Sequence, residues 1–519
     1  MALTLGAAAT AVSAACAQAQ PSGQNQRQST YPTPPSNGTL PQAAAISRAP
    51  AALRADLTRI YEATGGRPLW TGPLAQSLAA AVSQAYRHGL DPQAYGGDRL
   101  LNGSASDVDL TVAALNYAKV LSEGSVDPTT VEDLWEMRRN SADLASGLLS
   151  ATSQNRVGDW LESLAPDDIG YRNLSEGYVR YRQIAERGGW PTFRQGGKIE
   201  PGQSDPRLPA IKARLLAEGD LSPADELSLS GEGDLYGPTL ERGVRAFQLR
   251  HGLLVDGIIG EGTQSALSAS AMDRARQIAL NLERRRWLAR DVAPERIEVN
   301  TAAAIMVYWK DARPVHSNRV IVGTARNQTP SLEKPFASVV ANPPWYVPMS
   351  IARSEILPRG PGYLRNNNMY VVDGRVIQRA SPSSALGLVK FELVDSYAIF
   401  LHDTPTKPLF RHAFRHRSHG CVRVENAVEF ARLLLSPDPE RLARFDAALD
   451  SRNTTRVDTG RSISVRLLYW TAFVTGQGAV AFREDVYQRD QRLAEALGIA
   501  VNLPRAVDDG RNDPADVGP

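Results

Sequence analysis

The sequence is poor in cysteine and balanced in charge. Its 519 residues include two cysteines, Cys16 and Cys421, which are too few for a disulfide framework and form no pair at zinc-finger spacing. Lysine and arginine number 58 and aspartate and glutamate 56, which gives a net charge of +2. A nucleic-acid-binding protein would show a basic stripe or run, so we expect no nucleic-acid partner.

Long apolar runs are also scarce. After the first twenty residues none reaches the ~18 residues that a membrane-spanning helix needs, so we expect no transmembrane segment in the mature chain. Residues 1–19 are uncharged and mostly small and apolar, and Ala17-Gln18-Ala19 fits the cleavage site of an export signal. We expect cleavage before Gln20, which would leave Cys421 as the only thiol. A lipid anchor on Cys16 and a segment with neither function are the alternatives.

Composition and periodicity divide the first half of the chain into four parts. Residues 20–48 are rich in Gln, Pro, Ser and Thr and almost uncharged, which is typical of a disordered linker. Apolar residues at helical spacing predict an α-helical scaffold domain over 49–200. Residues 201–271 predict a compact unit of three short helices, and residues 272–290 a linking helix.

From about residue 296 the apolar pattern changes to period two, which indicates strands. We therefore expect a β-rich catalytic domain over 291–490, followed by a C-terminal helix and tail over 491–519. Within it, residues 349–384 are long for a connection between strands and begin with several prolines and glycines, which favours a lid over a nearby site. The predicted fold class is multidomain α+β.

One segment concentrates reactive residue types. It reads FLHDTPTKPLFRHAFRHRSHGCVRVENA and contains four of the seven histidines. A thiol needs a base or cationic surroundings to populate the thiolate at neutral pH, and His402, at the end of a predicted strand, could meet Cys421 across the loop. The backbone N–H groups of Gly420 and Cys421 could form an oxyanion hole.

Residue types alone leave two other interpretations open for this segment. A lone cysteine is usually a small, buried, inert side chain. Alternatively, four of these residues could ligate zinc: His402, Asp403, His419 and Cys421.

Several motifs resemble those of a known family. SHGCVR, preceded 19 residues earlier by HDTP, resembles the active-site signature of the L,D-transpeptidases, which are bacterial cell-wall enzymes. RNQTP, NPPWYVP and ALGLVKF precede it in the order found in the large periplasmic subgroup, whose chains carry a capping subdomain where residues 349–384 lie here. Tyr346 departs from that pattern, in which a smaller polar residue is expected. Residues 201–271 also resemble a peptidoglycan-binding module, through YGPTLERGVRAFQLRHGLLVDGIIGEGTQSAL.

The resemblance implies a cysteine transpeptidase that needs no metal or other cofactor. Cys421 would attack the carbonyl of the third residue of a tetrapeptide stem, release D-Ala and form a thioester. An amine of a neighbouring stem would then accept the acyl group, giving a 3→3 cross-link. His402 would be the general base, oriented by a backbone carbonyl, and His419 and Gly420 would support the thiolate and the oxyanion.

The resemblance also implies substrate-binding positions. Arg423 would hold a substrate carboxylate, with a structural salt bridge as the alternative. The other expected positions are Ser418, Asn342, Trp345 and Tyr346. Of these, Asn342 and Trp345 are expected to pack in the structure rather than to contact substrate. His412 and His416 match no motif position and are expected to be loop residues.

The implied partners are peptidoglycan stem peptides, and the implied location is the periplasm, in association with the cell wall. Three alternatives remain at this point. Water could replace the acceptor amine, giving an L,D-carboxypeptidase. A protein amine could replace it, giving a protein-anchoring enzyme. The chain could also be a wall-binding scaffold with an inactive domain.

Overall fold

The computed structural model describes residues 42–394 and 399–504. The predicted export signal lies outside these residues, as does most of the predicted linker. The described end of that linker differs from the prediction, because it folds as helix α1 and buries Ile46 against the scaffold core. No helix within the described ranges is long and apolar enough to cross a membrane.

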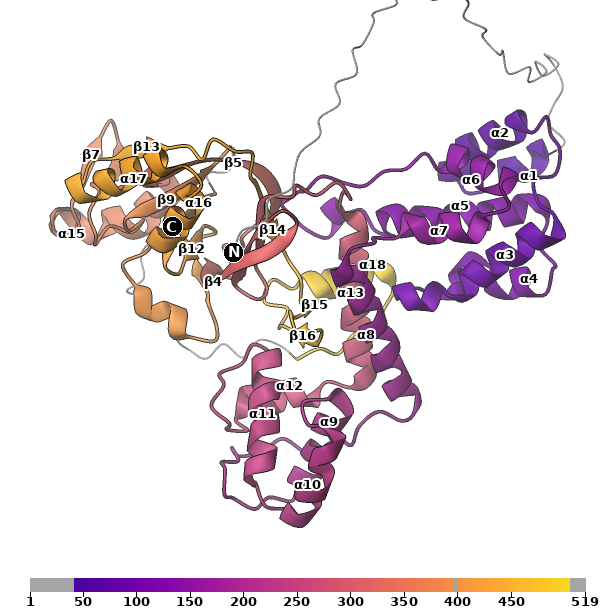
Figure 1. Ribbon diagram of the computed structural model, residues 1–519, viewed down its shortest axis with the longest axis horizontal. Coiled ribbons are helices and arrows are strands. Elements are labelled where there is room, and N and C mark those ends of the chain that lie inside the picture. The colour runs from indigo at the N-terminus through magenta and orange to yellow at the C-terminus, as the bar shows by residue number, and fades with distance from the viewer. Residues whose placement is uncertain (1–41, 395–398, 505–519) are drawn as a thin grey trace, which may run out of the picture.

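The scaffold region is a helical array with one short strand (Figure 1). Its apolar faces form a single core, in which Leu57, Ile60, Leu74 and Leu78 are buried as their spacing predicts. The elements are α1 (Ala43–Arg48), α2 (Arg54–Ala63), α3 (Gly72–Ser83), α4 (Gly97–Leu101), α5 (Asp107–Glu123), β1 (Trp135–Glu136), α6 (Leu144–Ser153), α7 (Val157–Leu164) and α8 (Ile169–Glu186).

The next region, at the bottom of Figure 1, has its own small core. Phe247 is fully buried in it, as expected for a residue that fills a small core. The region contains a fourth helix, α10, in addition to the three that were predicted, and its Leu229 joins the core. The helices are α9 (Leu208–Glu218), α10 (Glu226–Glu232), α11 (Pro238–Arg250) and α12 (Glu261–Ser268).

Helix α13 (Ala271–Trp287) links this region to the β-rich part and packs along α8 (Figure 1). This β-rich part, the predicted catalytic domain, is built on a sheet of order β1-β5-β14-β2-β3-β4-β12-β10-β9. Its elements are β2 (Arg296–Asn300), β3 (Ile305–Lys310), β4 (Arg313–Gly323), β5 (Ser331–Ala341), β9 (Val389–Leu393), β10 (Leu401–His402), β11 (His416–Ser418), β12 (Val422–Val424), α16 (Ala427–Leu435), α17 (Pro439–Ser451), β13 (Thr455–Val457), β14 (Ser464–Leu468), β15 (Ala472–Val474), β16 (Val480–Phe482) and α18 (Arg489–Leu497).

The predicted insert is an ordered subdomain with a separate core of eight buried residues. It extends beyond the predicted bounds of 349–384, because Trp345 and Leu386 belong to that core. Strands β7 and β8 form a hairpin that turns at Asp373-Gly374. A three-stranded sheet of order β6-β8-β7 carries two short helices; the elements are β6 (Trp345–Tyr346), α14 (Met349–Ile351), α15 (Gly360–Asn366), β7 (Met369–Val372) and β8 (Arg375–Gln378).

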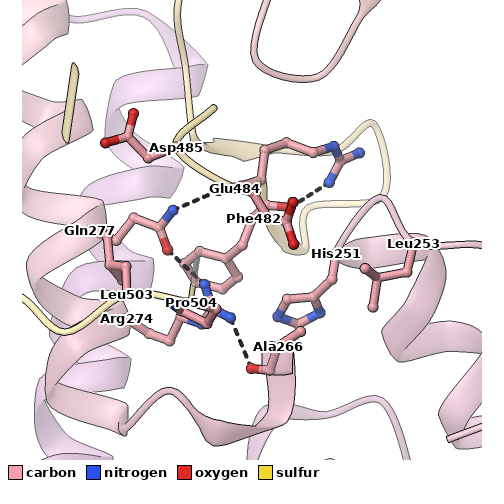
Figure 2. Close-up of a pocket in the computed structure, with 11 residues that line it drawn as sticks. His251, Leu253, Ala266, Arg274, Gln277, Phe482, Glu484, Asp485, Leu503 and Pro504 are labelled. Carbon is pink, nitrogen blue, oxygen red and sulfur yellow. Dashed lines mark hydrogen bonds between the residues drawn. The ribbon is translucent and has the colours of Figure 1, made fainter. Parts of the chain in front are cut away.

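Figure 2 shows the joint between α11, α13 and the β15–β16 hairpin. His251, which caps α11, stacks on Phe482 at a ring-centroid distance of 5.5 Å. From α13, the side-chain amide of Gln277 donates to the Arg483 carbonyl oxygen at 2.9 Å. Glu484 also lines this joint, and burial raises its pKa to about 7.

That raised pKa predicts a pH-dependent stability difference. Between the ordinary glutamate pKa of about 4.3 and the folded value, the folded state binds more protons than the unfolded state, so Glu484 lowers stability as pH rises. Glu484→Gln has no carboxyl group to ionise, so its stability does not fall with pH for this reason. We expect its stability relative to the wild type to increase from pH 5 to pH 8, by about 2 kcal/mol. Thermal unfolding at both pH values measures this change. Glu495→Gln, on the exposed face of α18, is the control, and an equal difference at both pH values would contradict the prediction.

Candidate active site

The candidate residues lie on one face of the catalytic sheet. In the parallel β10–β12 pair, Leu401 is opposite Val422 and His402 is opposite Arg423. Residues paired in register project from the same face, and side chains alternate between faces along a strand. Leu401 and Val422 enter the core beneath α16, so His402, Arg423 and, two residues before Arg423, Cys421 share the opposite face.

His402 has a fixed ring orientation. Its side chain is fully buried, and Nδ1 lies 2.5 Å from the carbonyl oxygen of Asp403. Because a carbonyl can only accept, Nδ1 carries the proton and Nε2 presents its lone pair. The Phe400 ring approaches edge-on, with centroids 5.6 Å apart. This arrangement leaves His402 in the tautomer that a general base requires.

The turn before Cys421 is held by internal hydrogen bonds. Gly420 has a φ of +116°, a conformation that favours glycine. The Gly420 N–H donates to Ser418 Oγ at 3.2 Å, and Ser418 Oγ donates to the Cys421 carbonyl at 2.6 Å. Cys421 itself is 6% exposed and is followed at once by β12. The serine hydroxyl therefore fixes the shape of this turn.

These hydrogen bonds contradict the roles that the sequence predicted for Gly420 and Ser418. The Gly420 N–H is already engaged with Ser418 Oγ, so in this conformation it does not add to an oxyanion hole. Ser418 is fully buried with its hydroxyl inside the turn, so it does not reach substrate. In both cases the polar group that was expected to contact substrate makes a hydrogen bond within the tight turn instead.

The three expected positions upstream of the motif differ in exposure: two are buried and one is exposed. Trp345 is 1% exposed and packs inside the insert, which excludes direct contact with substrate in this structure. Asn342 is buried and donates from Nδ2 to the carbonyl oxygen of Ala448 at 2.9 Å, so it ties β5 to the end of α17. Tyr346 is 68% exposed and lies on the opposite face of β6 from Trp345.

His419 connects the candidate site to the insert. Its Nε2 donates to Oε1 of Glu355 at 2.7 Å, and both side chains are partly exposed. Glu355 lies in a helical turn of the insert, residues 352–356. The insert therefore contacts the residue two positions before the candidate nucleophile, where a lid would need to act.

Two other residues of this segment, Arg415 and His416, serve the fold. The guanidinium of Arg415 donates to backbone carbonyls of Val320 and Ala304, and burial lowers its pKa to about 10. His416 donates from Nε2 to the Thr301 carbonyl at 3.0 Å, and burial lowers its pKa to about 4. Arg415 and His416 therefore hold the segment that precedes the nucleophile, and His416 lies in strand β11 rather than in a loop as predicted.

A charged groove that sequence reasoning missed lies on the same sheet face. Lys390 is opposite His402 in the β9–β10 pair. Glu392, two residues further along β9, contacts Lys390 at 3.2 Å and Arg456 at 2.6 Å. All three line the groove with Phe400. The alternation of charge around ALGLVKF could have indicated this lining, but only the pairing of β9 with β10 places it beside His402.

The zinc alternative is not supported by the arrangement of side chains. Among the described residues, no group of three or more His, Cys, Asp and Glu is placed to hold a metal ion. His402 Nδ1 faces a carbonyl oxygen, His419 faces Glu355, and the Asp403 carboxylate accepts from the Leu388 N–H at 3.0 Å.

Comparison with protein families assigns three parts of the chain. Residues 294–457 match the L,D-transpeptidase catalytic domain, residues 204–267 the "Putative peptidoglycan binding domain", and residues 55–177 the scaffold domain. The fold is thus a multidomain α+β architecture, as predicted. The chain carries an L,D-transpeptidase catalytic domain together with a scaffold domain and a peptidoglycan-binding domain.

Individual relatives cover parts of the chain. A Haemophilus influenzae protein named "Putative L,D-transpeptidase" is 32% identical over 220 residues, 38% of this chain and 45% of that relative. N-acetylmuramoyl-L-alanine amidase CwlM of Mycobacterium tuberculosis is 36% identical over 84 residues, 16% of this chain and 21% of that protein. The chain therefore spans less than half of either relative. The L,D-transpeptidase crystal structure from Xylanimonas cellulosilytica is 18% identical with a TM-score of 0.18, and the match covers 53% of this chain and 99% of that one.

Proposed function

We propose that this protein is a cell-wall L,D-transpeptidase that forms 3→3 cross-links between peptidoglycan stems, with Cys421 as its nucleophile. The observation that carries the proposal is the placement of Cys421 and His402 on one face of paired strands, with the His402 ring held by the Asp403 carbonyl. A histidine in this tautomer can take the thiol proton, and the thiolate is the reactive nucleophile.

The reaction follows in two balanced steps. His402 Nε2 takes the proton of Sγ, and the thiolate attacks the carbonyl carbon of the third stem residue. The C–N bond to D-Ala breaks, the departing amine takes the proton from His402, and a thioester remains. A neighbouring stem amine then attacks that carbonyl and passes a proton through His402 to the departing Sγ. The new amide forms as the thiol is restored.

Three further groups complete the proposed site. The Cys421 N–H stabilises the oxyanion. Arg423 lies on the same face but is only 1% exposed, so it adds positive charge beside the site rather than a direct contact to a substrate carboxylate. His419 supports the thiolate from the insert side. The peptidoglycan-binding domain holds the enzyme at the wall, which corresponds to a periplasmic location for an exported chain.

Incubation with a disaccharide-tetrapeptide, followed by mass spectrometry of the products, tests the proposal. We expect a cross-linked dimer and free D-Ala, with no loss after treatment with a chelator. Tripeptide without dimer would instead indicate an L,D-carboxypeptidase, and a product joined to a protein amine would indicate protein anchoring. No product from a folded protein would indicate a wall-binding scaffold.

The contact between His419 and Glu355 predicts a change in product distribution. Glu355→Ala removes this link between the insert and the catalytic strand, so water should reach the thioester more readily. A partly exposed ion pair contributes up to about 1 kcal/mol, so the tripeptide-to-dimer ratio should rise about 2- to 5-fold while Cys421 is still acylated. Shortening the insert between Pro358 and Asp373 should shift the ratio in the same direction.

Arg353→Ala is the matched control, because Arg353 is exposed on the same helical turn. An unchanged ratio in Glu355→Ala and in the shortened insert, together with a lower melting temperature, would mean that the insert only covers apolar surface.

A further inference from the structure

A buried polar network joins the scaffold domain to the C-terminal helix. Glu132, from the scaffold, accepts from Arg489 at 2.9 Å and from the Ser331 hydroxyl at 2.6 Å. Arg489 is the first residue of α18, and all three side chains are at most 4% exposed. The sequence separation between Glu132 and Arg489 is 357 residues, so this contact forms only when the scaffold and the catalytic part are docked.

The network continues to the peptide that precedes the nucleophile. The second terminal nitrogen of Arg489 donates to the carbonyl oxygen of Thr329 at 3.1 Å. The Thr329 hydroxyl donates to the carbonyl oxygen of Gly420 at 2.9 Å and accepts from the N–H of Gly323, also at 2.9 Å. Thr329 is fully buried. Its hydroxyl is therefore fixed from one side by β4 and holds the Gly420 carbonyl on the other.

This bond determines the direction of the next N–H. The described chain contains no cis peptide bond, and in a planar trans peptide the C=O and the N–H point in opposite directions. A hydroxyl that holds the Gly420 carbonyl therefore also fixes the Cys421 N–H on the far side of the peptide. We infer that Thr329 is a positioning residue that aligns the Cys421 N–H and Sγ for acyl transfer, and that Arg489 and Glu132 make this alignment depend on scaffold docking. This inference rests on the proposed function of Cys421.

Stability alone is a weak explanation for such a network. Burying Glu132 and Arg489 removes two charges from water, and apolar residues of similar volume are often at least as stable in such places. Two charged side chains held in one geometry do, however, specify a single position for Thr329. Misplacement of reacting groups by about 1 Å can lower rates about 100-fold, which gives this precision a catalytic use.

The test compares two reactions of the same thiol in the full-length protein. Acylation by a disaccharide-tetrapeptide, followed as D-Ala release in a single turnover, requires an aligned oxyanion donor. Alkylation by iodoacetamide requires thiolate and access but develops no oxyanion. For Thr329→Val we expect acylation to slow about 10- to 100-fold, with the alkylation rate and its pH profile unchanged. Thr329→Ser, which keeps the hydroxyl, should restore acylation.

The scaffold end of the network is tested by Glu132→Gln, which keeps the shape and removes the charge. We expect a smaller loss of acylation, about 3- to 10-fold, again without a change in alkylation. The matched control is Arg492→Ala, because Arg492 pairs with Asp133 at 3.0 Å on the exposed side of the same junction. That variant should acylate at the wild-type rate.

Wild-type acylation in Thr329→Val would overturn the inference while the proposed function stands. Equal losses of acylation and alkylation, or no rescue by Thr329→Ser, would also overturn it, because they indicate general loosening of the site. No acylation of the wild-type protein at Cys421 would remove the proposed function, and this inference with it.

Discussion

Cys421→Ala should abolish D-Ala release and cross-linking while the protein remains folded. The thiol supplies the bond that becomes the thioester, and alanine offers no nucleophile in its place, so we expect a loss of at least about 10⁴-fold. The side chain is small and buried, so its truncation leaves only a small void, and the melting temperature should change by a few degrees at most. Product formation and thermal unfolding of the same sample measure both effects.

Substrate binding by the inactive variant is the control for this experiment. Cys421→Ala should still bind disaccharide-tetrapeptide, because the rest of the site is unchanged. Residual turnover above a few per cent of the wild-type rate would contradict the assignment of the nucleophile.

His402→Gln should lower acylation about 10²- to 10⁴-fold at neutral pH, the range typical of a lost general base. The loss should shrink as pH rises toward 8.5, where an unassisted thiol ionises without a base. Single-turnover D-Ala release between pH 6 and pH 9 measures the profile.

His412→Gln, in the same segment but outside the motif, should follow the wild-type profile. A loss in His402→Gln that is constant across the whole pH range would mean that His402 positions groups rather than accepts the proton.

The short motifs were sufficient to predict those features of the site and the insert that depend on local backbone geometry. HDTP ends one strand and SHGC precedes the next, and the structure pairs these strands in parallel with His402 opposite Arg423, two residues after Cys421. The hairpin around Asp373-Gly374 was predictable because an Asp-Gly turn specifies its own backbone. These features depend on residues close together in the sequence.

Features that depend on distant residues were not predictable. Glu355 meets His419 over a separation of 64 residues, and Thr329 meets Gly420 over 91. Thr329 lies within RNQTP, a motif that supported the family resemblance, yet nothing in the sequence indicates which atom its hydroxyl contacts. The bond partner becomes visible only once β4 and the nucleophile turn are placed together.

Two other differences have a local physical cause. Period-two alternation predicts that Trp345 and Tyr346 lie on opposite faces but does not say which face is buried. Residues 43–48 have a composition that resembles a linker, yet Ile46 supplies enough apolar surface for this end to fold against the scaffold.

Mass spectrometry of the acylated enzyme shows directly whether Cys421 is the nucleophile. The full-length protein is mixed with disaccharide-tetrapeptide, quenched in acid before the acceptor step and digested. We expect the peptide containing Cys421 to gain the mass of the donor minus D-Ala, and the adduct to be absent from Cys421→Ala. Cross-linked product from the same reaction with no adduct on Cys421, or with the adduct on another residue, would contradict this assignment.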